Sequence, residues 1–167
     1  MTSRAFLGLG SNLGDRLANL GQAVSLLGPD EDIQVVRSSR VYETDPVGGP
    51  TQPEYLNAVI EVETSLAPQA LLARCLDVER AMGRVRAERW GPRVMDIDVL
   101  TYDELEVHEP GLTIPHPRMH ERGFVLIPLL ELMAEPVLPG GRRLKDLRLA
   151  AETFGGVRLF GPPLAIG

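Results

Sequence analysis

The sequence predicts an α+β domain in which two helices pack on one face of an antiparallel sheet. The chain has 167 residues, of which 44% are hydrophobic and 24% charged, as in ordinary globular domains. Apolar residues alternate along some segments and recur at helical spacing along others, in the order β-α-β-β-α-β. That order is typical of a ferredoxin-like βαββαβ core. We expect residues 1–167 to form a single domain, with additions that follow the core toward the C-terminus.

The first half of the core is predicted as a strand, a helix and a β-rich segment. Residues 5–10 form a short apolar run, and residues 33–43 are rich in β-branched side chains. The helix between them has apolar residues at helical spacing and ends at Gly28-Pro29: Leu17, Leu20, Val24 and Leu27. Glycines at 8, 10 and 14 have the spacing of neither a phosphate-binding loop nor a dinucleotide fingerprint, so we predict a tight strand-to-helix turn.

The second half repeats the pattern and then adds further elements. Residues 55–63 alternate, with Leu56, Ala58, Ile60 and Val62 on one face. A helix follows, with Pro68 in its first turn and Gly83 at its end, and then a strand over residues 95–102. The additions beyond the core are a hairpin-like piece, a helical run and a weaker helix, over residues 106–112, 121–132 and 144–153.

Charge and cysteine content narrow the possible classes of protein. The net charge is −6, which argues against a surface that binds nucleic acid or an anionic membrane. Cys75 is the only cysteine, so we expect no disulfide within the chain and a reducing cytoplasm as its location. The longest apolar run, residues 124–133, is too short to span a bilayer, and residues 5–9 do not resemble a signal peptide.

Two aspartates on one predicted strand are the sharpest chemical signal. Asp96 and Asp98 alternate with Met95, Ile97 and Val99, so both carboxylates lie on the same face with α-carbons about 6.6 Å apart. Neighbouring carboxylates repel each other, and a Mg²⁺ ion completed by phosphate oxygens would offset that repulsion. The alternative is a solvated strand face.

An arginine-rich segment precedes this strand. Arg84, Arg86, Arg89 and Arg93 fall within ten residues of an otherwise acidic chain. Guanidinium groups bind phosphate oxygens bidentately, so their position beside two carboxylates suggests a polyphosphate with its metal ion. A salt-bridge network and a small nucleic-acid patch remain the alternatives, and Trp90 is either a latch over the ligand or ordinary loop packing.

Two further groups of residues could bind ligands. Tyr55 and Asn57 share the face opposite the apolar stripe, where a ring and an amide suit a flat heterocycle. His116 lies between two prolines, and near phosphates it would be a hydrogen-bond donor. Structural packing of an aromatic ring under a loop, and a hydrogen-bonded structural histidine, are the respective alternatives.

Several short blocks stand in a fixed order between residues 8 and 136. They are Gly10-Ser-Asn-Leu-Gly14, Tyr55-Leu-Asn-Ala58, Gly83-Arg-Val-Arg86, Arg89-Trp-Gly-Pro-Arg93, Asp96-Ile-Asp98, Pro115-His116 and Arg122-Gly-Phe-Val-Leu-Ile-Pro-Leu129. Together they resemble the 6-hydroxymethyl-7,8-dihydropterin pyrophosphokinases of the folate pathway, a family with a ferredoxin-like core.

This resemblance implies a role for each of the singled-out residues. It implies that Asp96 and Asp98 hold two Mg²⁺ ions and that catalysis also uses Arg84 and Arg93. The implied pterin site consists of Thr44, Val47, Tyr55, Asn57 and Phe124, with Tyr55 and Phe124 on either side of the ring. The implied ATP site consists of Glu79, Arg84, Arg86, Trp90, Arg93, Val99, Thr113, His116 and Arg122.

The expected reaction is transfer of pyrophosphate from ATP to the pterin, with release of AMP. The expected partners are these two small molecules, with no nucleic acid or membrane, and the expected state is a monomer. Three other classes remain open on sequence grounds: a related kinase or nucleotidyltransferase, a metabolite-sensing module without turnover, and an RNA-binding module. The 5% aromatic content and the acidic charge argue against the last of these.

Overall fold

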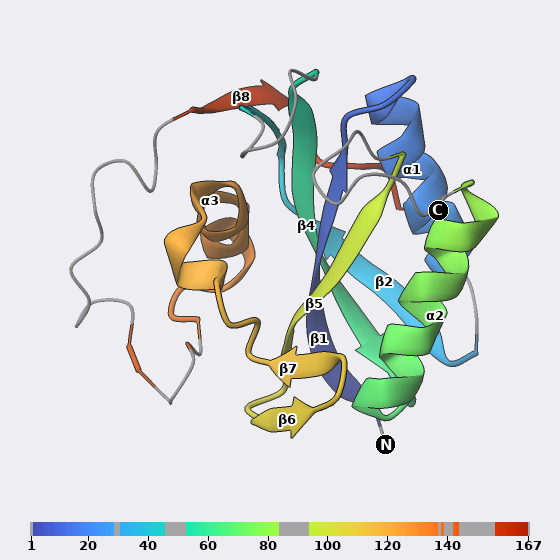
Figure 1. Ribbon diagram of the computed structural model, residues 1–167, viewed down its shortest axis with the longest axis vertical. Helices are drawn as coiled ribbons and strands as arrows, with labels where there is room; N and C mark the ends of the chain where they lie inside the picture. The colour runs from blue at the N-terminus through green and yellow to red at the C-terminus, as the bar shows by residue number, and fades with distance from the viewer. Residues whose placement is uncertain are drawn as a thin grey trace.

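The computed structural model describes residues 2–28, 31–45, 53–83, 94–136, 138, 142–143 and 156–166. A six-stranded sheet lies between helices α1 and α2 on one side and helix α3 on the other (Figure 1). The helices are α1 (Arg16–Leu27), α2 (Pro68–Ala81) and α3 (Gly123–Leu132), and a 3-10 turn, η1, covers Met119–Glu121. The strands of this sheet are β1 (Ser3–Ser11), β2 (Ile33–Ser38), β3 (Val41–Thr44), β4 (Tyr55–Thr64), β5 (Asp96–Tyr102) and β8 (Val157–Gly161).

All neighbouring strands of the sheet run antiparallel, in the order β5-β1-β4-β3-β8, with β2 also paired to β4. The predicted strand over residues 33–43 is therefore divided into β2 and β3. Ser39 lies at the division and stays bound to β4: its N–H donates to the carbonyl of Val59, and its Oγ accepts from the N–H of Val59. The serine hydroxyl replaces a ladder carbonyl, which lets the strand bend without leaving a buried N–H unpaired.

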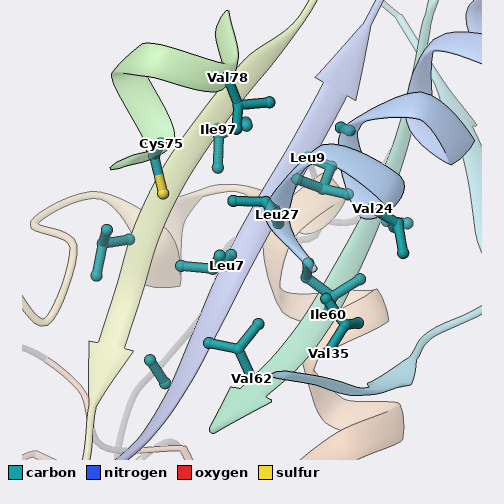
Figure 2. Packing of buried hydrophobic residues seen from close by; sticks show 14 of the residues in the cluster. Leu7, Leu9, Val24, Leu27, Val35, Ile60, Val62, Cys75, Val78 and Ile97 are labelled. Atoms are coloured by element: carbon teal, nitrogen blue, oxygen red, sulfur yellow. The ribbon is translucent and has the colours of Figure 1, made fainter. Parts of the chain in front are cut away.

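The larger core lies between the sheet and helices α1 and α2 (Figure 2). Its residues come from alternate positions of the strands and from one stripe of each helix, and include Leu7, Leu9, Val24, Leu27, Ile60, Val62, Cys75, Val78 and Ile97. The sequence correctly placed most of these residues. Leu17 is an exception, because its side chain is 47% exposed and α1 turns Leu20, Ala23, Val24 and Leu27 inward instead.

Helix α3 covers the opposite face of the sheet. Val125 and Leu129 pack there with Phe6, Val59 and Leu100 in a second core. The expected packing of two helices on one face is met by α1 and α2, and α3, for which no face was predicted, covers the other. Because both faces are covered, β4 is buried without interruption from Leu56 to Val62, although its side chains still alternate between the two cores.

A β-bulge interrupts the pairing of β5 with β1. Phe6 lies opposite Thr101 and Leu7 lies opposite Val99, so Leu100 is the extra residue. Leu100 packs in the second core, whereas Val99 and Tyr102 pack in the first. A bulge re-aims side chains by one position, and this one lets both ends of β5 bury their apolar residues against α1 and α2.

The C-terminal additions include a two-stranded sheet formed by β6 (Val107–Glu109) and β7 (Leu112–Ile114), which confirms the predicted hairpin. The predicted helical run from residue 121 begins as η1 and continues as α3. The weak helix predicted over residues 144–153 lies outside the described residues. Strand β8 was not predicted. None of the helices in the described part of the chain is long and apolar enough to cross a membrane.

Glu131 of α3 joins the helix to β3. Its carboxylate accepts hydrogen bonds from the Arg40 N–H (2.8 Å), from Arg40 Nε (3.0 Å) and from the Tyr42 hydroxyl. Burial alone would raise the pKa of Glu131, but these hydrogen bonds outweigh it and lower that pKa below the ordinary value. Glu131 therefore stabilises the fold in its ionised form.

We expect Glu131→Gln to lower the free energy of unfolding by about 1 kcal/mol at pH 7. Because the pKa of Glu131 is lower in the folded state, the unfolded chain binds more protons in acid. The stabilisation is complete above the ordinary pKa of about 4.3 and is lost as the pH falls through the folded value. Urea unfolding at pH 7 and near pH 3 checks this: the difference between wild type and variant should shrink in acid. Glu121→Gln, which affects an exposed ion pair with Arg118, is the control and should change little at either pH.

Candidate active site

The candidate site lies on the α3 face of the sheet, at the two positions of β1 that carry no side chain, Gly8 and Gly10. Gly8 is opposite Asp98 of β5 and Val59 of β4, and Gly10 is opposite Asp96 and Asn57. Residues directly opposite one another in a sheet project from the same face. The two aspartates and Asn57 therefore stand on either side of a floor of glycine backbone, which the side chain of Leu100 borders at Gly8.

The floor is narrow at Gly10. A Cβ atom there would lie 2.8 Å from Oδ1 of Asn57 and 3.4 Å from Cδ1 of Tyr55. Both predicted pterin ligands of β4 thus border the glycine. Only a residue without a side chain leaves space between them and the carboxylates of β5.

The amide of Asn57 has a fixed orientation. Its Nδ2 donates a hydrogen bond of 2.6 Å to Oγ1 of Thr44, and both side chains are buried. Its Oδ1 is the atom nearest to the site of a Cβ on Gly10. Asn57 therefore presents an acceptor above the glycine floor, while Thr44, another predicted pterin residue, holds the opposite end of the amide.

The second side of the site brings Asp98 together with His116 and Arg122. Burial lowers the pKa of the Arg122 guanidinium and of the His116 imidazole, and in both cases the nearby carboxylate of Asp98 acts in the opposite sense. Arg122 also lies over the ring of Phe124, with Cζ 5.6 Å from the ring centroid. Four residues predicted from three separate sequence blocks are thus neighbours in space.

His116 is held by two hydrogen bonds. The backbone N–H of His116 donates to the carbonyl of Leu100 (2.9 Å), and its ring Nδ1 accepts from the backbone N–H of Arg118 (3.3 Å). An imidazole whose Nδ1 accepts, and whose pKa is lowered by burial, is neutral near pH 7 with its proton on Nε2. His116 can therefore donate one hydrogen bond from Nε2 to a ligand.

Glu79 is buried at the edge of β5. Its Oε2 accepts a hydrogen bond of 2.7 Å from the N–H of Ile97, the residue between the two aspartates. Glu79 therefore faces the strand that carries the two aspartates and not solvent. Since the N–H of Ile97 points to this edge, the backbone of Val99, two residues further, is presented at the same edge.

The remaining predicted residues divide into two groups. Thr113 is half-buried on β7, opposite His108. The others lie outside the described residues: Val47, Arg84, Arg86, Trp90 and Arg93.

Sequence reasoning missed the residues that fix the edge of the site. Asn12 Nδ2 donates to the carbonyl of Pro53 (3.1 Å), and Arg16 Nη1 donates to the carbonyl of Glu54 (2.9 Å). Arg16 also pairs with Glu43 at 2.9 Å, and this hydrogen bond holds the pKa of the Glu43 carboxyl below its usual range. The Gly10–Gly14 turn was predicted correctly, but nothing in its spacing indicated contacts more than 35 residues away.

The donor set suits magnesium. Among the described residues no three His, Cys, Asp or Glu side chains form a closed metal cage. Asp96 and Asp98 instead offer two carboxylates on one strand face, bordered by backbone. Mg²⁺ is commonly held by one or two carboxylates and completed by water and substrate phosphates, so these residues fit that ion better than a metal that needs an all-protein cage.

Comparison with known proteins places this chain in a class. The chain is a kinase-type transferase. It belongs to the 7,8-dihydro-6-hydroxymethylpterin-pyrophosphokinase (HPPK) family, whose model matches residues 6–134, and it is a pyrophosphokinase of folate biosynthesis.

Individual relatives agree with this assignment. The pyrophosphokinase of Methylorubrum extorquens is 48% identical over 153 residues, which are 92% of this chain and 96% of that protein. The pyrophosphokinase of Bacillus subtilis is 46% identical over 132 residues, 79% of each chain. A crystal structure of the HPPK-DHPS protein of Plasmodium falciparum superposes with a TM-score of 0.67 at 16% identity, over 87% of this chain and 44% of that longer one, and supports the fold alone.

Proposed function

We propose that this protein transfers the β,γ-diphosphate of ATP to the hydroxymethyl oxygen of 6-hydroxymethyl-7,8-dihydropterin across the glycine floor of β1. The observation that carries the proposal is the register of Gly10, which has Asp96 on one side and Asn57 on the other. Asn57, which suits a heterocycle, and Asp96, which suits a metal–phosphate complex, thus share one face of the sheet. Each lies one strand away from Gly10, on opposite sides of it.

The pterin is bound by Tyr55, Asn57, Phe124, Thr44 and the backbone around Val47. Asn57 Oδ1 accepts from the donor edge of the pterin, because its Nδ2 is already committed to Thr44. Tyr55 and Phe124 stack on the two faces of the ring. The position of Tyr55 beside Gly10, and of Phe124 beside Arg122, supports this assignment.

ATP is bound from the side of β5. His116 donates from Nε2 and Arg122 from its guanidinium to phosphate oxygens, and the nearness of both to Asp98 supports this role. Thr113 and the arginines Arg84, Arg86 and Arg93 complete the phosphate contacts, and Trp90 covers them. The backbone of Val99 on the outer side of β5, beside Glu79, receives the nucleoside.

Asp96 and Asp98 would hold two Mg²⁺ ions. Such ions would neutralise charge on the phosphate oxygens and make the attacking hydroxyl more acidic. Glu79 contributes indirectly, because its hydrogen bond to Ile97 fixes the backbone between the two aspartates.

In the reaction, the pterin hydroxymethyl oxygen forms a bond with the β-phosphorus of ATP. The bond from the β-phosphorus to the oxygen bridging to the α-phosphorus breaks, and AMP leaves with that oxygen. The hydroxyl proton is released to solvent. Arg84 and Arg93 stabilise charge that accumulates on the phosphate oxygens, and the neutral His116 binds one of these oxygens without taking up the proton.

The same proposal extends to the organisation of the protein. The core has the ferredoxin-like βαββαβ order, with its second strand divided into β2 and β3. Residues 1–167 form one domain, which the return of β8 to the sheet of the first half supports. The enzyme acts as a cytoplasmic monomer; the free thiol of Cys75 is consistent with a reducing compartment, and sedimentation would test the oligomeric state.

The test is to incubate the purified protein with ATP, Mg²⁺ and 6-hydroxymethyl-7,8-dihydropterin and to identify the nucleotide released. We expect AMP in a one-to-one ratio with pterin diphosphate, no nucleotide release without the pterin, and none with excess EDTA. Release of ADP would contradict transfer of a diphosphate. Binding of both ligands without turnover, by protein shown to be folded, would indicate a sensing module instead.

A further inference from the structure

The C-terminal strand β8 lies at the end of the sheet where β4 begins (Figure 1). It pairs with β3, and Val157 is opposite Thr44. Thr44 in turn is opposite Tyr55 of β4, and its hydroxyl accepts from Asn57. The family match ends at residue 134, so β8 lies outside the segment that the family comparison covers.

Arg158 of β8 bridges the two strands that carry the proposed pterin ligands. Its Nη1 donates to Asp45 Oδ1 (3.2 Å), directly after β3, and its Nη2 donates to Glu54 Oε2 (2.5 Å), directly before β4. Its Nη2 also lies 3.6 Å from Oε1 of Glu43. One guanidinium therefore contacts a carboxylate on each side of the Thr44–Tyr55 pair.

Backbone contacts fix the same place. The N–H of Asp45 donates to the carbonyl of Gly156 (3.0 Å). Gly156 has φ +72°, and a Cβ atom on it would lie 2.6 Å from Oδ2 of Asp45, so only glycine fits here. The approach of β8 to Asp45 is thus close and specific.

A second arginine, Arg16 of α1, also connects the end of β3 with the start of β4. Arg16 binds the carbonyl of Glu54 and the carboxylate of Glu43, and its guanidinium lies 5.8 Å from the ring centroid of Phe160 in β8. Without Arg158, the neighbouring carboxylates of Glu43, Asp45 and Glu54 would face one another with Arg16 as the only other cation that the described contacts give them. Their mutual repulsion would then favour separation of the end of β3 from the start of β4.

We propose that Arg158 is a positioning residue for the pterin: it holds Asp45 and Glu54 together, and so keeps Thr44, Tyr55 and Asn57 in register for binding. Strand β8 therefore contributes to pterin binding through Arg158, although it carries no residue that contacts the pterin in the proposed site. This inference rests on the proposed placement of the pterin at Tyr55 and Asn57.

The test compares Arg158→Leu, Arg158→Lys and the control Arg80→Leu, which removes another exposed arginine, paired with Asp77 on α2. For Arg158→Leu we expect the KM and Kd for the pterin to rise about three- to fivefold, since exposed ion pairs have modest effects. The KM for ATP and kcat should change less than twofold. Arg158→Lys should fall between wild type and Arg158→Leu, because one ammonium cannot donate to both carboxylates with separate nitrogens.

Salt gives a second readout that loss of packing alone would not produce. The pterin Kd of the wild type should rise with ionic strength, and Arg158→Leu should lack most of this rise. An unchanged pterin Kd for Arg158→Leu, an equal change in the KM for ATP, or the same effect from Arg80→Leu would overturn the inference. Asn57→Ala distinguishes failure of the proposed pterin site from failure of the role of Arg158. If Asn57→Ala binds pterin normally, the proposed pterin site is wrong. If Asn57→Ala loses pterin binding but Arg158→Leu does not, only the role of Arg158 is wrong.

Discussion

Replacing Asp96 or Asp98 with alanine is expected to lower kcat on the order of a thousandfold without unfolding the protein. Both side chains project from an edge strand onto the glycine floor, and in the proposed site they hold the metal ions of the ATP complex. Aspartate is a poor strand former and the two carboxylates repel each other, so removal of either should leave stability unchanged or slightly increased. Steady-state kinetics with thermal unfolding of each variant checks both parts.

The matched control for these variants is Asp77→Ala. Asp77 lies on α2 with its side chain 65% exposed, in an ion pair with Arg80, and its loss should leave kcat within twofold of wild type. Titration with Mg²⁺ adds a readout besides turnover, because the Asp96 and Asp98 variants should lose Mg²⁺-dependent binding of a non-hydrolysable ATP analogue. An Asp98→Ala enzyme with more than a tenth of wild-type kcat would contradict the metal assignment.

Gly10→Ala is expected to weaken pterin binding by at least about tenfold, although it adds a single methyl group. Its Cβ would lie 2.8 Å from Oδ1 of Asn57, closer than such atoms approach in proteins. The amide cannot turn away without breaking its 2.6 Å hydrogen bond to Thr44, so it must shift, and the acceptor that the pterin needs shifts with it. Isothermal titration with the pterin measures the loss directly.

Gly21→Ala is the control for this substitution. Gly21 lies on α1 with nothing within 4 Å of an added Cβ, so alanine there should stabilise the helix by about 0.5–1 kcal/mol and leave pterin affinity unchanged. The Kd of the nucleotide should be nearly the same in Gly10→Ala and wild type, since the added methyl faces Asn57 and Tyr55. Loss of ATP and pterin binding in equal measure would indicate general misfolding and not a blocked floor.

The elements that the sequence predicted well are those specified by local patterns. Alternation along β4 placed Leu56, Ala58, Ile60 and Val62 in one core, and the same rule put Asp96 and Asp98 on the opposite face from Ile97 and Val99. Helix α1 ends before Gly28 as predicted, and Asp15 caps its start by accepting from the N–H of Ala18. Such signals depend on neighbours only a few residues apart, which a single sequence records.

The elements that escaped prediction depend on partners far along the chain. Arg158 meets its carboxylates at separations of 104 and 113 residues, and the mostly apolar residues around it carry no local mark of that contact. Helix α3 was expected, but its face was not, because an apolar helix can cover either side of a sheet. The glycine floor depends on register: the glycines were visible, but only the pairing of β1 with β4 and β5 shows what stands beside them.

Cys75 offers a way to observe the molecule opening. Cys75 lies on α2, and its thiol is fully buried between this helix and the sheet. Burial, aided by the charges of Glu79 and Asp98, raises the pKa of the thiol to about 12. A thiol in that state is almost never a thiolate at neutral pH and is shielded from reagents, so it reacts only when α2 leaves the sheet. Since this is the only cysteine, labelling of the native protein by a thiol reagent reports one event. The factor by which bound substrates lower the labelling rate would measure how strongly the active site is coupled to α2.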